Sequence, residues 1–162
     1  MKCKLKKITH LSGNKASIYS VVMDGDTKTL YEIFLAENFT SYLSEIKQIN
    51  KIIQVIGNKT GAIDGFFKDK EGRKGDNIYA LYDLPKYKLR LYCIKYGSQI
   101  IILGGGGPKS NKTKALQDDP KLKTENYFLR WLSEQITVRL QSDIHISNDG
   151  LDLLGDLEFE DE

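Results

Sequence analysis

The stretch Tyr87–Ala115, YKLRLYCIKYGSQIIILGGGGPKSNKTKA, predicts two β-strands joined by a tight turn at Tyr96-Gly97-Ser98. Side chains alternate between two faces along the first strand. One face is mainly apolar and consists of Tyr87, Leu89, Leu91 and Cys93. The other face is charged and aromatic and consists of Lys88, Arg90 and Tyr92. The second strand runs through a glycine run to a lysine cluster, which consists of Lys109, Lys112 and Lys114. A charged strand face beside these lysines indicates a polyanion-binding site, with phosphodiester chemistry as the first hypothesis.

Upstream of this hairpin, the sequence predicts another hairpin and a short helix. Lys4–Thr9 and Ala16–Met23 supply β-branched apolar residues on either side of a turn. Thr29–Glu37 has the spacing of a helix, and Asp26 or Thr27 is its expected N-cap.

The remaining elements follow from apolar periodicity and from breaker residues. A helix over Thr40–Ile56 carries a single apolar stripe and ends at Gly57. Ile78–Asp83 reads as a strand. Asp118-Asp119-Pro120 predicts an end to local order before an amphipathic helix over Asn126–Leu140. The order ββ-αα-βββ-α predicts an α+β domain, in which a small antiparallel sheet is flanked by helices and followed by an extra C-terminal helix.

Charge is distributed unevenly along the 162 residues. All basic residues precede Asp149, so residues 1–148, with 24 basic and 15 acidic side chains, carry a net charge of +9. The basic body favours nucleic acid, anionic lipid or an acidic protein as a partner, although a solvated, lysine-rich surface gives the same count. We therefore expect one basic domain over residues 1–148 and an acidic, disordered tail over 149–162, which would shield the basic surface in cis.

The two cysteines, Cys3 and Cys93, are too few for a disulfide framework or a zinc site. The N-terminus has no apolar run of signal-peptide length, and Gln99–Leu103 is too short to span a membrane. These features favour a cytoplasmic protein without a membrane partner.

Several familiar chemistries do not fit the sequence. A phosphate-binding loop ending at Lys109 would need glycines where Leu103 and Pro108 stand. The two histidines, His10 and His145, are isolated, which argues against a metal centre and a Ser-His-Asp system. We expect no cofactor.

Lysine, arginine and tyrosine remain, and they suit the cleavage of RNA by its own 2′-hydroxyl. By residue type, an arginine such as Arg90 suits the phosphorane charge, and a lysine crowded by other cations, such as Lys109 or Lys112, suits a base or an acid. A tyrosine such as Tyr92 would stack on a base or donate a proton. Further RNA contacts are expected from the neighbouring basic residues Lys86, Lys88, Lys114, Arg73 and Lys74. Each residue also has a structural interpretation: a sheet-surface ion pair for Arg90, core packing for Tyr92 and solvated loop charge for the lysines.

Four successive segments resemble the RelE/ParE superfamily of bacterial toxins, and within it the HigB-like mRNA interferases. They are the helix Thr40–Ile56, NKTGAID at Asn58–Asp64, DNIYALYDL at Asp76–Leu84, and the strand pair with its lysine-rich exit. The similarity covers about residues 16–117. It implies a toxin of a type II toxin–antitoxin system that cleaves mRNA on the ribosome and is masked by an antitoxin, expected to be a helix-turn-helix protein. It also implies that Arg90 stabilises the phosphate charge and that Lys109 or Lys112 binds it.

The chain departs from this family pattern after residue 119. Pro120–Glu162 is additional, the acidic tail is foreign to the type, and no C-terminal histidine or tyrosine marks the general acid. Two alternatives therefore stay open: a ParE-like protein that inhibits DNA gyrase by contact, and an inactive relative.

Overall fold

A computed structural model describes residues 1–69, 71, 76–109 and 119–161, and this part of the chain forms an α+β fold. The strands are β1 (Lys2–Lys7), β2 (Ser17–Met23), β3 (Phe67–Lys68), β4 (Ile78–Leu81), β5 (Leu89–Tyr96), β6 (Ile100–Pro108), β7 (Ile144–Ile146), β8 (Leu153–Gly155) and β9 (Glu158–Glu160). The α-helices are α1 (Leu30–Asn38), α2 (Leu43–Val55) and α3 (Pro120–Arg139). Short turns of 3-10 helix, η1 (Thr9–Leu11) and η3 (Asp64–Phe66), and of π-helix, η2 (Ile56–Thr60), lie between them.

The described strands form a seven-stranded sheet in the order β3-β4-β5-β6-β2-β1-β9 and a separate hairpin of β7 and β8. Strands β2 and β6 are parallel, with Ser17 beside Ile100 and Ser20 beside Leu103, and the other neighbours are antiparallel. The sheet is therefore larger than expected and mixed. The parallel pair arises because two helices and three strands lie between β2 and β6 in the chain, a separation that permits a crossover connection.

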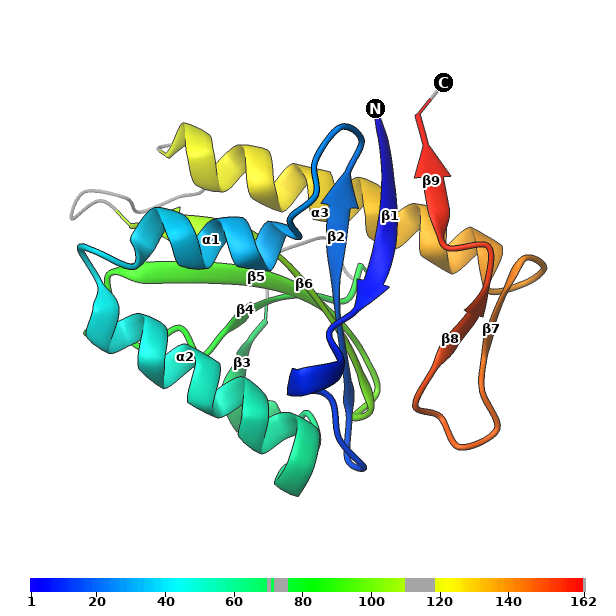
Figure 1. Cartoon of the computed structure of the whole chain (residues 1–162), viewed down its shortest axis with the longest axis horizontal. Coiled ribbons are helices and arrows are strands. Elements are labelled where there is room, and N and C mark those ends of the chain that lie inside the picture. Colours follow the sequence, from blue (N-terminus) through cyan, green and yellow to red (C-terminus); the bar gives the residue numbers. More distant parts are fainter. Residues whose placement is uncertain (70, 72–75, 110–118, 162) are drawn as a thin grey trace.

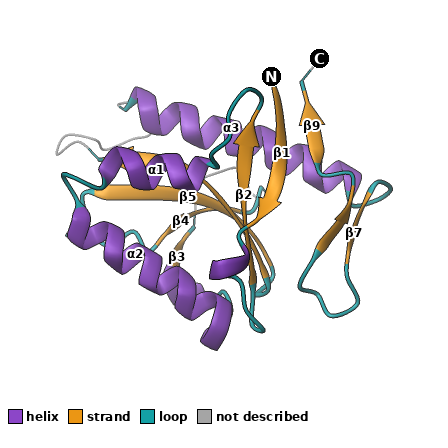
Figure 2. Cartoon of the chain, viewed as in Figure 1, coloured by secondary structure: helices purple, strands orange, loops and turns teal. Residues whose placement is uncertain are grey.

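Three layers make up the molecule, with α1 and α2 on one face of the sheet and α3 on the other (Figure 1). Figure 2 shows the same arrangement with the helices enclosing the sheet. Alternate residues of β5 divide between the two cores: Leu89, Leu91 and Cys93 pack towards α1 and α2, whereas Tyr92 and Ile94 pack towards α3. The central hairpin is thus buried on both faces, and the face that the sequence predicts to be charged is apolar beyond Arg90.

The glycine run lies inside strand β6 and not in a loop after it. A Cβ atom on Gly104 would meet Leu129, and one on Gly105 would meet Glu125, both from α3. Glycine therefore allows this helix to pack close to the strand. The pairing of β5 with β6 also shifts register between Leu91 and Cys93, which is a β-bulge opposite the glycines.

Helix α1 begins with a capping box. Thr29 accepts a hydrogen bond from the backbone N–H of Glu32, and the Glu32 carboxylate accepts one from the backbone of Thr29. The expectation that Asp26 or Thr27 caps this helix is therefore wrong, since the helix starts at Leu30.

The other two helices also differ from the prediction at their ends. The N-cap of α2 is Tyr42, and beyond Val55 the chain continues through η2 to Gly61, which has a φ of 71°. Helix α3 starts at Pro120, because Asp119 accepts a hydrogen bond from the backbone N–H of Leu122 and caps it. Asp119-Pro120 thus begins a helix instead of ending local order.

The acidic C-terminal residues up to Asp161 are structured, contrary to the expected disordered tail. Strand β9 pairs with β1 at the edge of the sheet, where Lys2 faces Glu160 and Lys4 faces Glu158. Opposite charges across a strand pair are favourable, and the Phe159 side chain between them is buried in the core under α3. The tail therefore completes the sheet edge, and both chain ends lie side by side (Figure 1).

Candidate functional site

Three cations surround the carboxylate of Asp83, whose side chain is only 1% exposed. Lys109 Nζ lies 2.6 Å from Asp83 Oδ1, and Arg90 Nε lies 3.0 Å from Asp83 Oδ2. Lys68 Nζ is 3.4 Å from the same Oδ2 atom. These four side chains are referred to below as the Asp83 cluster. Arg90 and Lys109 are 14% and 17% exposed, so they lie at the surface with limited access to water.

Backbone geometry brings these residues together from separate elements. Arg90 pairs with Gly107 in the β5–β6 ladder, and the backbone N–H of Lys109 donates to the Lys88 carbonyl at 2.6 Å. Asp83 follows Tyr82, the first residue after β4, which has the left-handed conformation with a φ of 50°. A bulky residue rarely adopts this conformation, which often marks a functional or constrained site.

Helix α2 fixes the start of β5. The Glu45 carboxylate accepts hydrogen bonds from the backbone N–H groups of Lys88, at 2.8 Å, and Leu89, at 3.0 Å. The strand that carries Arg90 is thereby held by an element far from it in sequence.

Asp83 is anionic because its cationic partners lower its pKa by more than burial raises it. Burial alone would raise the pKa of the Asp83 carboxyl, but the hydrogen bond from Lys109 and the charges of Arg90, Lys109 and Lys68 hold this pKa below its usual value. The nearby carboxylate likewise keeps the pKa of Arg90 above its ordinary value despite burial. Asp83 is thus anionic and Arg90 cationic at neutral pH.

Two further groups extend the cluster inward. Burial raises the pKa of Glu71, although Arg90 and Lys68 oppose this change, and Glu71 Oε1 lies 3.7 Å from Lys68 Nζ. Burial also raises the pKa of Tyr92 to about 12, against the opposing influence of Arg90. The Tyr92 hydroxyl approaches the Arg90 guanidinium, but it does not meet hydrogen-bond geometry with any group of the described residues. Tyr92 therefore lies behind Arg90 in the core.

The structure brings together two of the predicted catalytic residues, Arg90 and Lys109, although they are 19 positions apart. Lys86 and Lys88 are exposed before β5, and Lys86 Nζ lies 5.8 Å from the centre of the Tyr87 ring. The other predicted residues lie outside the described part of the chain; they are Lys112, Lys114, Arg73 and Lys74.

The sequence prediction omits Asp83 and Glu71, and for Lys68 it leaves open a second polyanion contact or exposed loop charge. One signal was present for Asp83: a single carboxylate closes an otherwise apolar strand directly before Leu84 and Pro85. A strand-end position is where binding residues of sheet proteins often lie.

Two partly exposed aromatic residues, Tyr82 and Tyr87, lie between β4 and β5, close to Asp83 in the chain. The Tyr82 ring packs edge-on against Phe66, at 6.2 Å between centroids, and against Tyr87, at 5.6 Å. Tyr82 and Tyr87 are partly exposed. Cations beside partly exposed aromatic rings are the groups with which proteins hold single-stranded nucleic acid.

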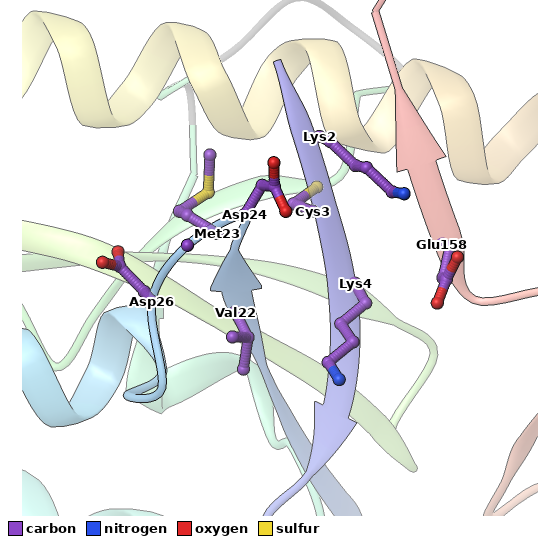
Figure 3. A pocket seen from close by; sticks show the side chains of 9 residues that line it. Lys2, Cys3, Lys4, Val22, Met23, Asp24, Asp26 and Glu158 are labelled. Atoms are coloured by element: carbon purple, nitrogen blue, oxygen red, sulfur yellow. The ribbon is translucent and has the colours of Figure 1, made fainter.

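A hollow of about 210 Å³ lies at the sheet edge formed by β1 and β9, opposite the edge near the Asp83 cluster (Figure 3). Its charges are mixed, because Lys2 and Lys4 share it with Asp24, Asp26 and Glu158. A polyanion would meet both attraction and repulsion there, so the hollow suits it less well than the Asp83 cluster.

The described residues contain no candidate metal-binding group and no candidate membrane-spanning helix. None of them form a group of three or more His, Cys, Asp or Glu side chains arranged to hold a metal ion. In that same part of the chain, no helix combines the length and the apolar character needed to cross a membrane. Comparison of the whole chain with protein-family models, with curated proteins and with solved structures finds no match.

Proposed function

We propose that this protein is an endoribonuclease that cleaves mRNA on the ribosome, acting as the toxin of a type II toxin–antitoxin pair. The convergence of Arg90 and Lys109 on Asp83 carries the proposal. It gives one small area of the surface two phosphate-binding side chains of different geometry, a planar fork and a point charge. The resemblance to HigB-like interferases supplies the substrate and the partner, an antitoxin that masks the basic surface.

The reaction needs little from the protein beyond these groups. The RNA 2′-oxygen forms a bond to phosphorus while the bond to the 5′-oxygen breaks, and a proton moves from the first oxygen and another to the second. Arg90 would stabilise the charge of the pentacoordinate phosphorus. Lys109 would neutralise the phosphate, and the partly buried Glu71 carboxyl, with its raised pKa, is a group suited to accept the proton of the 2′-hydroxyl. Positioning of the message by the ribosome would supply the alignment that the cluster lacks.

A non-catalytic, ParE-like function has one observation in its favour. Both cations are already paired with Asp83, and the Tyr92 hydroxyl is buried behind them. Such an arrangement binds a negatively charged partner without providing an exposed acid and base. DNA gyrase inhibition by protein contact is therefore the second candidate.

Induced expression in a bacterial host separates the two candidates, with growth recorded while the 5′ ends of cellular mRNA are mapped by primer extension. The variants are Arg90→Ala and Lys109→Ala, and the matched control is Lys4→Ala, an exposed lysine of β1 beside the opposite sheet edge. Growth arrest with new mRNA ends, lost in both variants and kept in the control, supports the proposal. Arrest without cleavage supports the ParE-like candidate, and no arrest with folded protein argues against both.

A further inference from the structure

We propose that Asp83 is the positioning residue of this site: it holds Arg90 and Lys109 in one geometry and restrains their attraction for RNA. The catalytic part of this inference rests on the proposed function. The binding part concerns single-stranded RNA in general and stands without it.

The geometry of the contact resembles that of a bound phosphate. The two oxygens of Asp83 share one central atom, and each is taken by a different cation, Lys109 at 2.6 Å and Arg90 at 3.0 Å. Among the residues that the structure describes, this anchoring and the 3.4 Å contact of Lys109 with the Leu84 carbonyl use one of the five N–H groups of Arg90 and two of the three of Lys109. The remaining N–H groups are not needed for anchoring and suit the oxygens of a phosphodiester.

The Asp83 carboxylate also reduces the electrostatic repulsion between Arg90 and Lys109. Arg90 belongs to β5 and Lys109 directly follows β6, and both have flexible side chains. Without the carboxylate they would repel each other and adopt several rotamers. With the carboxylate between them, both cations are directed by a group that is itself immobilised, since Asp83 is buried. Lys68, the third partner, is 52% exposed and lies at the outer side of the cluster.

Removal of the negative charge has two opposite consequences. The Asp83→Asn variant should bind single-stranded RNA more tightly than wild type, because one anion no longer competes with the phosphates. The slope of log affinity against log salt concentration should become steeper by about 0.7, the amount expected for one further phosphate contact with single-stranded RNA. Cleavage should fall by about 100-fold, as expected when the reacting groups are misplaced. A change that merely disrupted the fold would weaken both activities together.

The first measurement is the fluorescence anisotropy of a labelled oligouridylate at several salt concentrations, combined with the primer-extension assay for cleavage. Asp152→Asn is the matched control, because Asp152 also pairs with a lysine, Lys7 at 2.6 Å, and its loss changes the net charge equally. Tighter binding and weaker cleavage by Asp83→Asn alone support the inference. Binding no tighter than that of the control, or cleavage equal to wild type, overturns it.

A double variant covers the case in which Asp83→Asn does not fold. Asp83→Asn/Lys109→Gln removes a cation together with the anion, so no additional unpaired charge remains. Because Asp83 also holds Arg90, the double variant should cleave less than Lys109→Gln alone; cleavage equal to that of Lys109→Gln contradicts the positioning role. If the wild-type protein produces no mRNA cleavage, the proposed function fails, while the binding comparison still decides the role of Asp83.

Discussion

At the scale of single residues, Asp83 and Gly106 determine the site in different ways. Asp83 contributes a buried charge that is tolerated only because cations approach both of its oxygens. Gly106 contributes the absence of a side chain: a Cβ atom there would collide with the Arg90 carbonyl oxygen on the neighbouring strand. The position of Arg90 therefore depends on a residue that makes no side-chain contact with it.

Substitution of Gly106 by alanine should destabilise the protein by about 1–3 kcal/mol, because backbone atoms would have to move to relieve the collision. Gly65→Ala is the matched control, since nothing lies within 4 Å of a Cβ atom at that position. Urea denaturation followed by circular dichroism measures the free energy of unfolding of both variants. Equal stability of the two variants would show that β6 has room at Gly106.

Glu125 gives a prediction for pH. Its carboxyl faces Gly105, and burial raises its pKa despite the charge of Lys121. The folded state therefore retains the proton to higher pH than the unfolded state does. Its contribution to stability is complete below the unfolded pKa, about 4.3, and is lost as pH rises through the folded pKa.

The Glu125→Gln variant should accordingly lose less stability than wild type between pH 4 and pH 7, as measured by thermal unfolding at each pH. Glu134→Gln, an exposed position on the same helix, is the control. A parallel decline in Glu125→Gln and wild type would contradict the expected titration.

At the scale of elements, helix ends and strand neighbours decide where each segment begins and what it covers. Local patterns predict the existence of α1, α2 and α3, because apolar periodicity is a property of adjacent residues. Their first residues follow from which polar side chain reaches a free backbone N–H group, as Thr29 and Asp119 do. Several neighbouring residues could cap a helix equally well, so this choice is visible only in three dimensions.

Helix α1 tests this reasoning. Thr29→Ala should cost about 1–2 kcal/mol of stability, because the N–H of Glu32 loses its acceptor. Thr27→Ala is the matched control, since Thr27 is exposed and precedes the helix. The stabilities of the two variants are compared by their midpoints of chemical denaturation. A larger loss in Thr27→Ala would mean that the helix begins earlier than the structure places it.

At the scale of the whole molecule, the acidic C-terminal segment and the Asp83 cluster lie on opposite sides of the sheet. Strand β9 forms one edge, whereas Lys68, Asp83 and Arg90 belong to or adjoin β3, β4 and β5 at the other. In the described part of the chain, the tail therefore makes no contact with the Asp83 cluster that would shield it in cis. Its acidic residues instead face the lysines of β1.

Deletion of residues 157–162 should lower stability and leave RNA affinity unchanged, because it removes Phe159 from the core and uncovers β1. The point variant Phe159→Ala should reproduce most of the loss, about 3–5 kcal/mol. Glu160→Ala, an exposed neighbour on the same strand, is its control. Thermal unfolding and RNA anisotropy measure the two quantities, and tighter RNA binding by a folded truncated protein would restore the shielding model.

The sequence by itself determined the central hairpin, its turn, the alternation of β5 and the α+β class, because these depend on neighbours within a few residues. It also selected Arg90 and Lys109 as candidates from their chemistry. Only the tertiary structure decided that both cations meet at Asp83, that Tyr92 is buried beneath α3 and that the glycine run accommodates this helix. Those outcomes depend on the parallel pairing of β2 with β6, on the packing of α3 and on the turn at Tyr82. The β2–β6 pairing and the packing of α3 join segments far apart in the chain. Their geometry is set by burial of both sheet faces and not by local preference.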